Sequence, residues 1–170
     1  MPVSTITDSG PEHLRGLLRH FADLRDGVHG DGAVSRQDKE ALFADAVGWL
    51  DGVARQALAE INDALLLRSG AVAATGLRRS TDGDATAAWL LSWPEQRDRG
   101  LQPVTLEAFF GLRFHHPHLR GATVGNWPLN VFNPADAEAQ LPTLRTIAAA
   151  DLHNLVFQSD YRIVPAVMRP

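Results

Sequence analysis

Residues 35–67 read SRQDKEALFADAVGWLDGVARQALAEINDALLL, and they carry the strongest helical pattern in the chain. Ser35, followed three positions later by Asp38, resembles a capping box, which favours the start of a helix. The apolar side chains behind it keep one phase at about 100° per residue; they are Phe43, Ala46, Val47, Leu50, Val53, Ala54, Ala57, Leu58, Ile61 and Leu65. Gly48 lies off this stripe, so it weakens the helix without shifting its phase. We predict one long helix over 35–67 that packs a broad apolar face on a core.

The apolar face of this helix has one alternative use, an interface with a partner chain, most simply a second copy. A strict coiled-coil seam occupies a narrow stripe, and the arc here is wider. An intramolecular core is therefore the favoured interpretation, and partner binding or homo-oligomerisation through 35–67 is the alternative.

A shorter amphipathic pattern precedes the long helix and predicts a helix over 11–26, with Pro11 at its start. Its apolar stripe is expected to face the core; it consists of Leu14, Leu17, Leu18, Phe21 and Leu24. His13 and His20 lie at one edge of this stripe, about 10 Å apart along the axis, which is too far to chelate one ion as a pair. We expect both rings to pack their carbon atoms at the edge of the core.

Beyond residue 70 the hydrophobic period changes to that of strands. Residues 71–79 and 84–93 flank Ser80-Thr81-Asp82-Gly83, and an Asp-Gly step is a strong hairpin signal. Trp89 and Trp93 share one face of the second strand, which favours a sheet packed on helices over the floor of an aromatic ligand pocket.

The rest of the chain predicts short elements and a C-terminal helix. They are a turn at 94–100, a short helix at 103–110, a short strand at 129–132, a helix begun by Asn133-Pro134, an interruption at Pro142, a second helix capped by Thr143, and a strand at 161–164. We expect 1–10 and 166–170 to be loose tails. The fold class is therefore α+β in a single domain over 1–170, with a small antiparallel sheet built on the hairpin.

Composition narrows the classes of function. The chain has 170 residues, of which 45% are apolar and 21% charged, which is typical of a globular protein. A net charge of −4 gives no general attraction to nucleic acid, and the absence of cysteine excludes thiol nucleophiles and thiolate metal sites. No signal peptide or membrane-length apolar run is evident, so we expect a cytoplasmic protein without membrane contact. Lys39, the only lysine, is expected on the polar side of its helix, away from any chemistry.

Three of the seven histidines fall within four positions of the stretch Phe114-His-His-Pro-His-Leu-Arg-Gly121. Pro117 disfavours a helix and pushes the preceding residue toward extended geometry. In an extended chain His116 and His118 point to the same side, together with Phe114. Two imidazoles at this spacing suit zinc or a similar divalent ion, or acid–base catalysis. The alternative is a solvated loop.

Asp151 lies in the middle of the apolar stripe of the last helix, where an unpaired carboxylate is costly to bury. The stripe consists of Leu144, Ile147, Ala148, Leu152 and Leu155. Three roles would explain this acid: a buried pair with an arginine, a cap on another element, or an active-site acid.

The sequence therefore predicts a small-molecule-binding protein and leaves three uses of its site open. The first is a hydrolase or lyase that acts on a small anionic substrate, with or without a divalent metal. In this hypothesis the catalytic residues and the metal ligands are His116, His118 and Asp151, and the substrate-binding residues are Arg113, Arg120, Trp127 and His115. The second is the non-catalytic oligomerising or partner-binding subunit, and the third is a binding pocket without chemistry. No nucleophile-elbow, phosphate-loop or His-Glu-x-x-His motif occurs in the chain.

Overall fold

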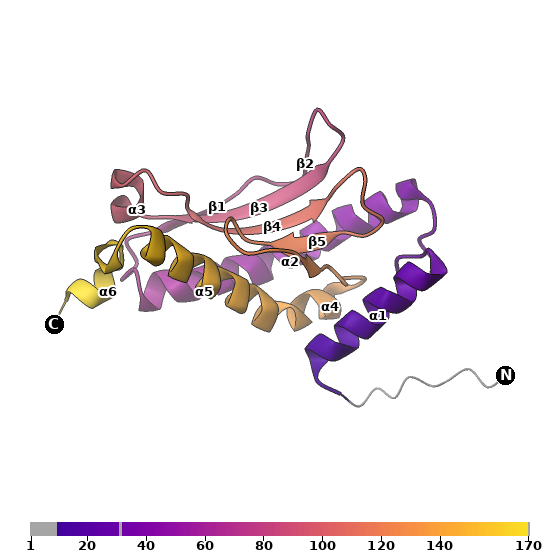
Figure 1. Cartoon of the computed structure of the whole chain (residues 1–170), viewed down its shortest axis with the longest axis horizontal. Helices are drawn as coiled ribbons and strands as arrows, with labels where there is room; N and C mark the ends of the chain where they lie inside the picture. The colour runs from indigo at the N-terminus through magenta and orange to yellow at the C-terminus, as the bar shows by residue number, and fades with distance from the viewer. Residues whose placement is uncertain (1–9, 31, 170) are drawn as a thin grey trace.

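The computed structural model describes residues 10–30 and 32–169, which form two layers. Helices α2 and α5 cover one face of an antiparallel sheet, and helix α1 lies to one side of these two layers (Figure 1). This arrangement confirms the predicted α+β class. None of the helices in these residues combines the length and apolar character that a membrane crossing requires.

Two helices precede the strands, one short helix interrupts the strands, and the remaining helices follow them. The helices are α1 (Glu12–Asp26), α2 (Arg36–Ala64), α3 (Pro94–Asp98), α4 (Pro134–Ala139), α5 (Leu141–Gln158) and α6 (Pro165–Met168), with a 3₁₀ turn η1 (Tyr161–Ile163). The strands are β1 (Ala71–Ala74), β2 (Arg78–Arg79), β3 (Ala85–Ser92), β4 (Val104–Phe110), β5 (His118–Arg120) and β6 (Trp127–Pro128). They pair in the order β1-β3-β4-β5-β6, and β2 also pairs with β3.

Helix α2 confirms the prediction of one long helix that begins after Ser35, but it ends at Ala64 and not at residue 67. The Ser35 hydroxyl accepts a hydrogen bond from the Asp38 backbone N–H at 3.1 Å, which caps the first turn. Most of the predicted apolar stripe is buried in contact with the sheet, α4 and α5. The stripe is thus used inside the chain, which leaves little of it for the partner interface that was the alternative.

The predicted hairpin is also present. Gly83 has φ +90°, a value that favours glycine in the turn, and β3 pairs on one side with β1 and β2. Trp89 and Trp93 are buried in the core, and the indole N–H of Trp93 donates to the Ile163 carbonyl at 2.6 Å. Both tryptophans therefore belong to the core, and Trp93 holds the C-terminal turn against it.

Several short elements differ from their predictions. Residues 103–110 form strand β4 instead of a helix, because pairing with both β3 and β5 outweighs local preference. The strand expected at 129–132 lies at Trp127–Pro128, and 161–164 is mainly a 3₁₀ turn.

Three further segments differ from their predictions: residues 94–100, the C-terminal tail and the start of the last long helix. Residues 94–100 contain α3, and α6 lies where a loose tail was expected. Helix α5 begins at Leu141, because Pro142 fits a first turn, so Thr143 does not cap it. Residue 10 is exposed, while 1–9 and 170 of the predicted tails lie outside the described residues.

Helix α1 is oriented opposite to the prediction. Its buried residues are His20 and Asp23, whereas four members of its apolar stripe are between 45% and 57% exposed; they are Leu14, Leu18, Phe21 and Leu24. The amide of Asn130 donates to the Gly16 carbonyl at 2.8 Å, which joins the polar face of α1 to the body of the protein. Polar contacts, and not the apolar stripe, thus set the orientation of this helix.

This orientation predicts a tolerant apolar stripe on α1. Replacing Phe21 or Leu24 with serine should change the free energy of unfolding by less than about 0.5 kcal/mol, because surface substitutions rarely exceed that value. Replacing the fully buried Leu58 of α2 with serine should cost more than about 3 kcal/mol. Urea unfolding of the three variants would measure the difference. A cost at Phe21 equal to that at Leu58 would place the stripe in the core.

Candidate metal centre

The histidine-rich segment runs through a loop and enters strand β5 at His118. His116 is buried, His118 is half-buried, and His115 is exposed. The two inward histidines agree with the predicted alternation, whereas Phe114 is 49% exposed and does not point into the core. Its ring instead makes an edge contact with His118 at 6.1 Å between centroids.

Two further histidines meet this segment from the N-terminal part of the chain. His20 of α1 lies 5.1 Å from His116 and 5.7 Å from His118, measured between ring centroids. His29, in the glycine-rich linker between α1 and α2, lies 5.5 Å from His116. Four imidazoles are therefore gathered where α1, the linker and β5 come together.

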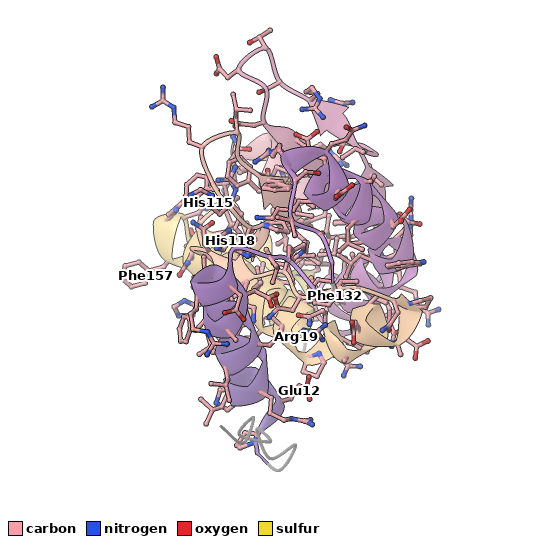
Figure 2. All side chains as sticks on the ribbon, turned by 90° about the vertical axis from the view of Figure 1, so that its right-hand side faces the viewer. Glu12, Arg19, His115, His118, Phe132 and Phe157 are labelled. Atoms are coloured by element: carbon pink, nitrogen blue, oxygen red, sulfur yellow. The ribbon has the colours of Figure 1, made fainter. Side chains whose placement is uncertain are left out.

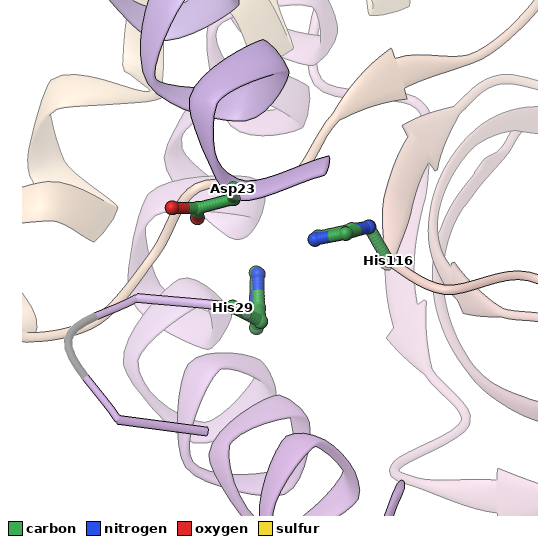
Figure 3. A group of neighbouring side chains, drawn as sticks. All are labelled: Asp23, His29 and His116. Atoms are coloured by element: carbon green, nitrogen blue, oxygen red, sulfur yellow. The ribbon is translucent and has the colours of Figure 1, made fainter. Parts of the chain in front are cut away.

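Asp23, His29 and His116 form the group within this cluster that has the spacing of metal ligands. Each offers one ligand atom, and the three atoms lie within 4.8 Å of one another. Figure 3 shows the three side chains on separate segments around one space, with a nitrogen of each imidazole facing it. All three residues are buried. A tetrahedral ion with ligand bonds of about 2.0–2.1 Å separates its ligands by about 3.4 Å, so small side-chain movements would complete the site.

The linker is folded tightly to bring His29 to this place. The Asp23 carboxylate accepts a hydrogen bond from the Gly30 N–H at 3.0 Å, and His29 forms a backbone bridge with Ala33. Gly30 has φ +66°, and a Cβ there would lie 2.7 Å from the Phe132 ring. Glycine is thus required at position 30 for both conformation and space.

The hydrogen bonds of His116 define its tautomer. Its Nε2 lies 2.6 Å from the Val28 carbonyl oxygen, and because a carbonyl only accepts, Nε2 carries the proton. The lone pair is then on Nδ1. The Nδ1 atoms of His116 and His29 are both buried without a hydrogen-bond partner in the described part of the chain. Buried nitrogens without partners are rare, and each calls for an explanation.

The cluster is held in the neutral form. Burial, followed by the proximity of His116, lowers the pKa of His29 to about 3, and Lys39 adds to this effect. Burial lowers the pKa of His20 to about 4, with smaller contributions from His116 and His118. The pKa values of His116 and His118 are also lowered, mainly by burial. At neutral pH these imidazoles therefore keep the lone pairs that metal binding needs.

Lys39 lies beside this cluster, in contrast to the prediction. The residue is buried, and its ammonium group donates to the His115 carbonyl at 3.3 Å. The only lysine of the chain thus supports the histidine loop from α2. Its positive charge disfavours protonation of the nearby imidazoles.

Asp151 does not join the histidines. Its carboxylate accepts hydrogen bonds from the Thr105 N–H at 2.9 Å, the Thr123 N–H at 2.7 Å and the Thr123 hydroxyl at 2.5 Å. Of the three predicted roles, the cap on other elements is the one observed. Gly121 allows the close approach, since a Cβ there would lie 3.3 Å from the Asp151 carboxylate. The acid that accompanies the histidines is Asp23.

The four predicted substrate-binding residues do not meet at one site, although Arg113 and His115 line the same surface pocket. Arg113 and His115 are exposed, and Figure 2 shows His115 and His118 beyond the C-terminal end of α1. Arg120 forms an ion pair with Glu107 and stacks on the Phe109 ring at 4.1 Å, which leaves its guanidinium occupied. Trp127 is half-buried and lines a groove beside α1.

Sequence reasoning missed Asp23, His20 and His29 as members of the site. His20 and Asp23 are three residues apart and so share one face of α1, which is a recognisable polar pair. The apolar stripe on the opposite face was a stronger pattern and suggested the reverse orientation. No periodicity marks His29, because it lies in a linker.

No family model matches the chain, and neither a curated protein nor a solved structure matches it.

Proposed function

We propose that this protein binds a divalent transition-metal ion of the zinc class through Asp23, His29 and His116. The observation that carries the proposal is that one ligand atom from each of these three buried residues lies within 4.8 Å of the other two, and that burial keeps the two imidazoles neutral. Two histidines and one carboxylate are a common ligand set for zinc. Three protein ligands leave a fourth position, which is the coordination typical of catalytic zinc, where water or a substrate completes the shell.

The surroundings of the three residues suit this role. The Val28 carbonyl accepts from His116 Nε2 and so orients the ring. An ion bound at Nε2, the nitrogen that Figure 3 shows facing the space, would take the place of this bond, with the ring proton on Nδ1. The Gly30 N–H on Asp23 orients the carboxylate in the same way. His20 and His118 border the site as groups that can exchange protons with a bound water.

Zinc titration of tag-free, EDTA-treated protein tests the proposal. We expect one ion per chain, and we expect His29→Ala and His116→Ala to weaken zinc binding by more than about 100-fold, since loss of an outer partner alone typically costs 10–100-fold. Zinc at 100 times its Kd should also raise the free energy of unfolding by about 2.7 kcal/mol. Isothermal titration calorimetry and urea unfolding measure the two effects.

The matched control is His153→Ala, which removes an exposed histidine of α5 far along the chain from the cluster. Its zinc affinity should equal that of the wild type. An absence of binding at micromolar zinc, or an equal loss of affinity in the His153 variant, would rule out the proposed centre. Circular dichroism of the His29 and His116 variants separates loss of ligand from loss of fold.

A further inference from the structure

Helix α1 is attached to the rest of the protein with little burial of apolar surface. Its buried residues are both polar, namely His20 and Asp23, whereas four apolar side chains of its stripe are between 45% and 57% exposed. The helix also lies to one side of the two layers, so its release leaves the sheet and the helices packed on it in place (Figure 1). Segments with few buried apolar contacts are the ones that open most easily. Helix α1 is therefore expected to be less stable than α2.

The contacts of α1 outside the histidine cluster are weak ones. Among the described residues they include the hydrogen bond from the Asn130 amide to the Gly16 carbonyl, at 2.8 Å, and the Arg19 guanidinium 4.1 Å above the Phe132 ring. A single hydrogen bond, and a cation over an aromatic ring at an exposed position, each contribute little net stability in water. These contacts orient α1 but do not hold it firmly.

The three proposed metal ligands lie on both sides of the boundary between α1 and the body of the protein. Asp23 belongs to α1 and His29 to the linker that follows it, whereas His116 belongs to the loop that enters β5. An ion on these ligands replaces the bond between His116 Nε2 and the Val28 carbonyl by ligand bonds to two residues of the N-terminal segment. It thus forms a cross-link between α1 with its linker and the body.

His116 is the fixed end of this cross-link. The residues on either side of it are both bonded to the body of the protein. The Lys39 ammonium of α2 donates to the His115 carbonyl at 3.3 Å, and the Leu129 N–H donates to the Pro117 carbonyl at 3.1 Å. Neither bond involves α1, so the His116 loop keeps its place when the helix moves away.

We propose that the bound metal ion fastens α1 to the body, so that the metal-free protein repeatedly releases α1 while α2, α5 and the sheet stay folded. The inference rests on the proposed function, because it needs an ion that Asp23, His29 and His116 bind together. An ion that binds the docked helix and not the released one shifts the docking equilibrium by a factor of 1 + [ion]/Kd, which is about 100 at 100 times the Kd. The free metal concentration thus controls how often α1 is released.

Amide hydrogen exchange of the full chain, followed by mass spectrometry of its peptides, tests this inference with zinc as the probe. The amides of a helix exchange when the helix opens, so their rate reports the released fraction. In EDTA-treated protein we expect the amides of residues 15–26 to exchange at least about 100-fold faster than those of residues 43–61 in α2. Zinc at 100 times its Kd should slow the exchange of residues 15–26 by about 100-fold.

His116→Ala and His153→Ala form the matched pair of variants. The first removes the ligand on the body side, and the second removes an exposed histidine of α5. Zinc should slow the exchange of α1 in the His153 variant as in the wild type, and it should have no effect in the His116 variant. The wild-type comparison stands even when the His116 variant does not fold.

The possible outcomes separate this inference from the metal centre itself. Exchange of α1 as slow as that of α2 in EDTA-treated protein would show that the helix opens only with the whole fold, which overturns the inference. One bound zinc ion with unchanged exchange in α1 would overturn the inference and leave the metal centre intact. No zinc binding in the calorimetric titration would overturn both.

Discussion

Replacing Asp151 with alanine is expected to lower the free energy of unfolding by about 3–5 kcal/mol, because it removes the acceptor of three hydrogen bonds. The carboxylate is 0% exposed, and the N–H of Thr105 at the start of β4 is buried with it. Water cannot replace the lost acceptor without opening the contact between α5 and the sheet. The Thr123 N–H and hydroxyl lose the same partner.

Asp151→Asn should lower the free energy of unfolding by about 1–2 kcal/mol less than Asp151→Ala does. The amide keeps one acceptor oxygen, but it turns an NH₂ group toward another donor. Asp63→Ala is the matched control, since its carboxylate is exposed and, among the described residues, pairs with Arg68 alone; it should cost less than about 0.5 kcal/mol. Urea unfolding measures all three variants. A change at Asp151 no larger than that at Asp63 would show that this carboxylate does not hold the loop to the sheet.

The same variants separate the two candidate acids. Zinc affinity should be unchanged in Asp151→Asn and greatly weakened in Asp23→Asn, as long as both proteins are folded at the temperature of the titration. The reverse result would return the metal centre to the ligands that the sequence predicts, namely His116, His118 and Asp151.

The second large effect is a loss of stability in mild acid. A histidine whose pKa is lowered by folding contributes stability that is fully present above its unfolded pKa of 6.5 and is lost as the pH falls toward the folded pKa. The folded values are about 4 for His20 and about 3 for His29, so the window extends from about 6.5 down to 3–4. At pH 5 the contribution of each of these two histidines to the free energy of unfolding should be smaller by about 2 kcal/mol than at neutral pH, because each pH unit is worth about 1.36 kcal/mol.

Urea unfolding in metal-free buffer between pH 7 and pH 5 measures this dependence. His29→Gln should reduce the slope of stability against pH by up to one proton, whereas His153→Gln, at an exposed position, should leave it unchanged. His118 and His116 contribute in the same direction, because their pKa values are lowered as well. A flat profile over this range, or equal slopes in the His29 and His153 variants, would contradict the neutral buried cluster.

The histidine segment shows how far sequence reasoning reached into the site. Pro117 and the alternation of side chains correctly placed His116 and His118 inward. The partner acid was assigned to Asp151 because a carboxylate within an apolar stripe requires a partner. Asp151 finds that partner in the backbone of Thr105 and Thr123, a contact between segments that no local pattern reveals.

Helix α1 shows the opposite case, in which a correct local assignment led to the wrong orientation. The helix was predicted within one residue, yet its polar face, with His20 and Asp23, is turned to the body of the protein. Amphipathicity predicts only that two faces differ. Which face is buried depends on the groups available opposite the helix, and here these include His116, His118 and Asn130.

The sequence by itself determined the long helix over 35–67, the hairpin around Gly83 and the apolar stripe of the last helix, because periodicity and turn chemistry are local properties. Only the tertiary structure decided that 103–110 is a strand and that Asp23 and His29 accompany His116. Strand pairing and metal-ligand spacing depend on distances between segments far apart in the chain, and these distances are set by packing rather than by the order of residues.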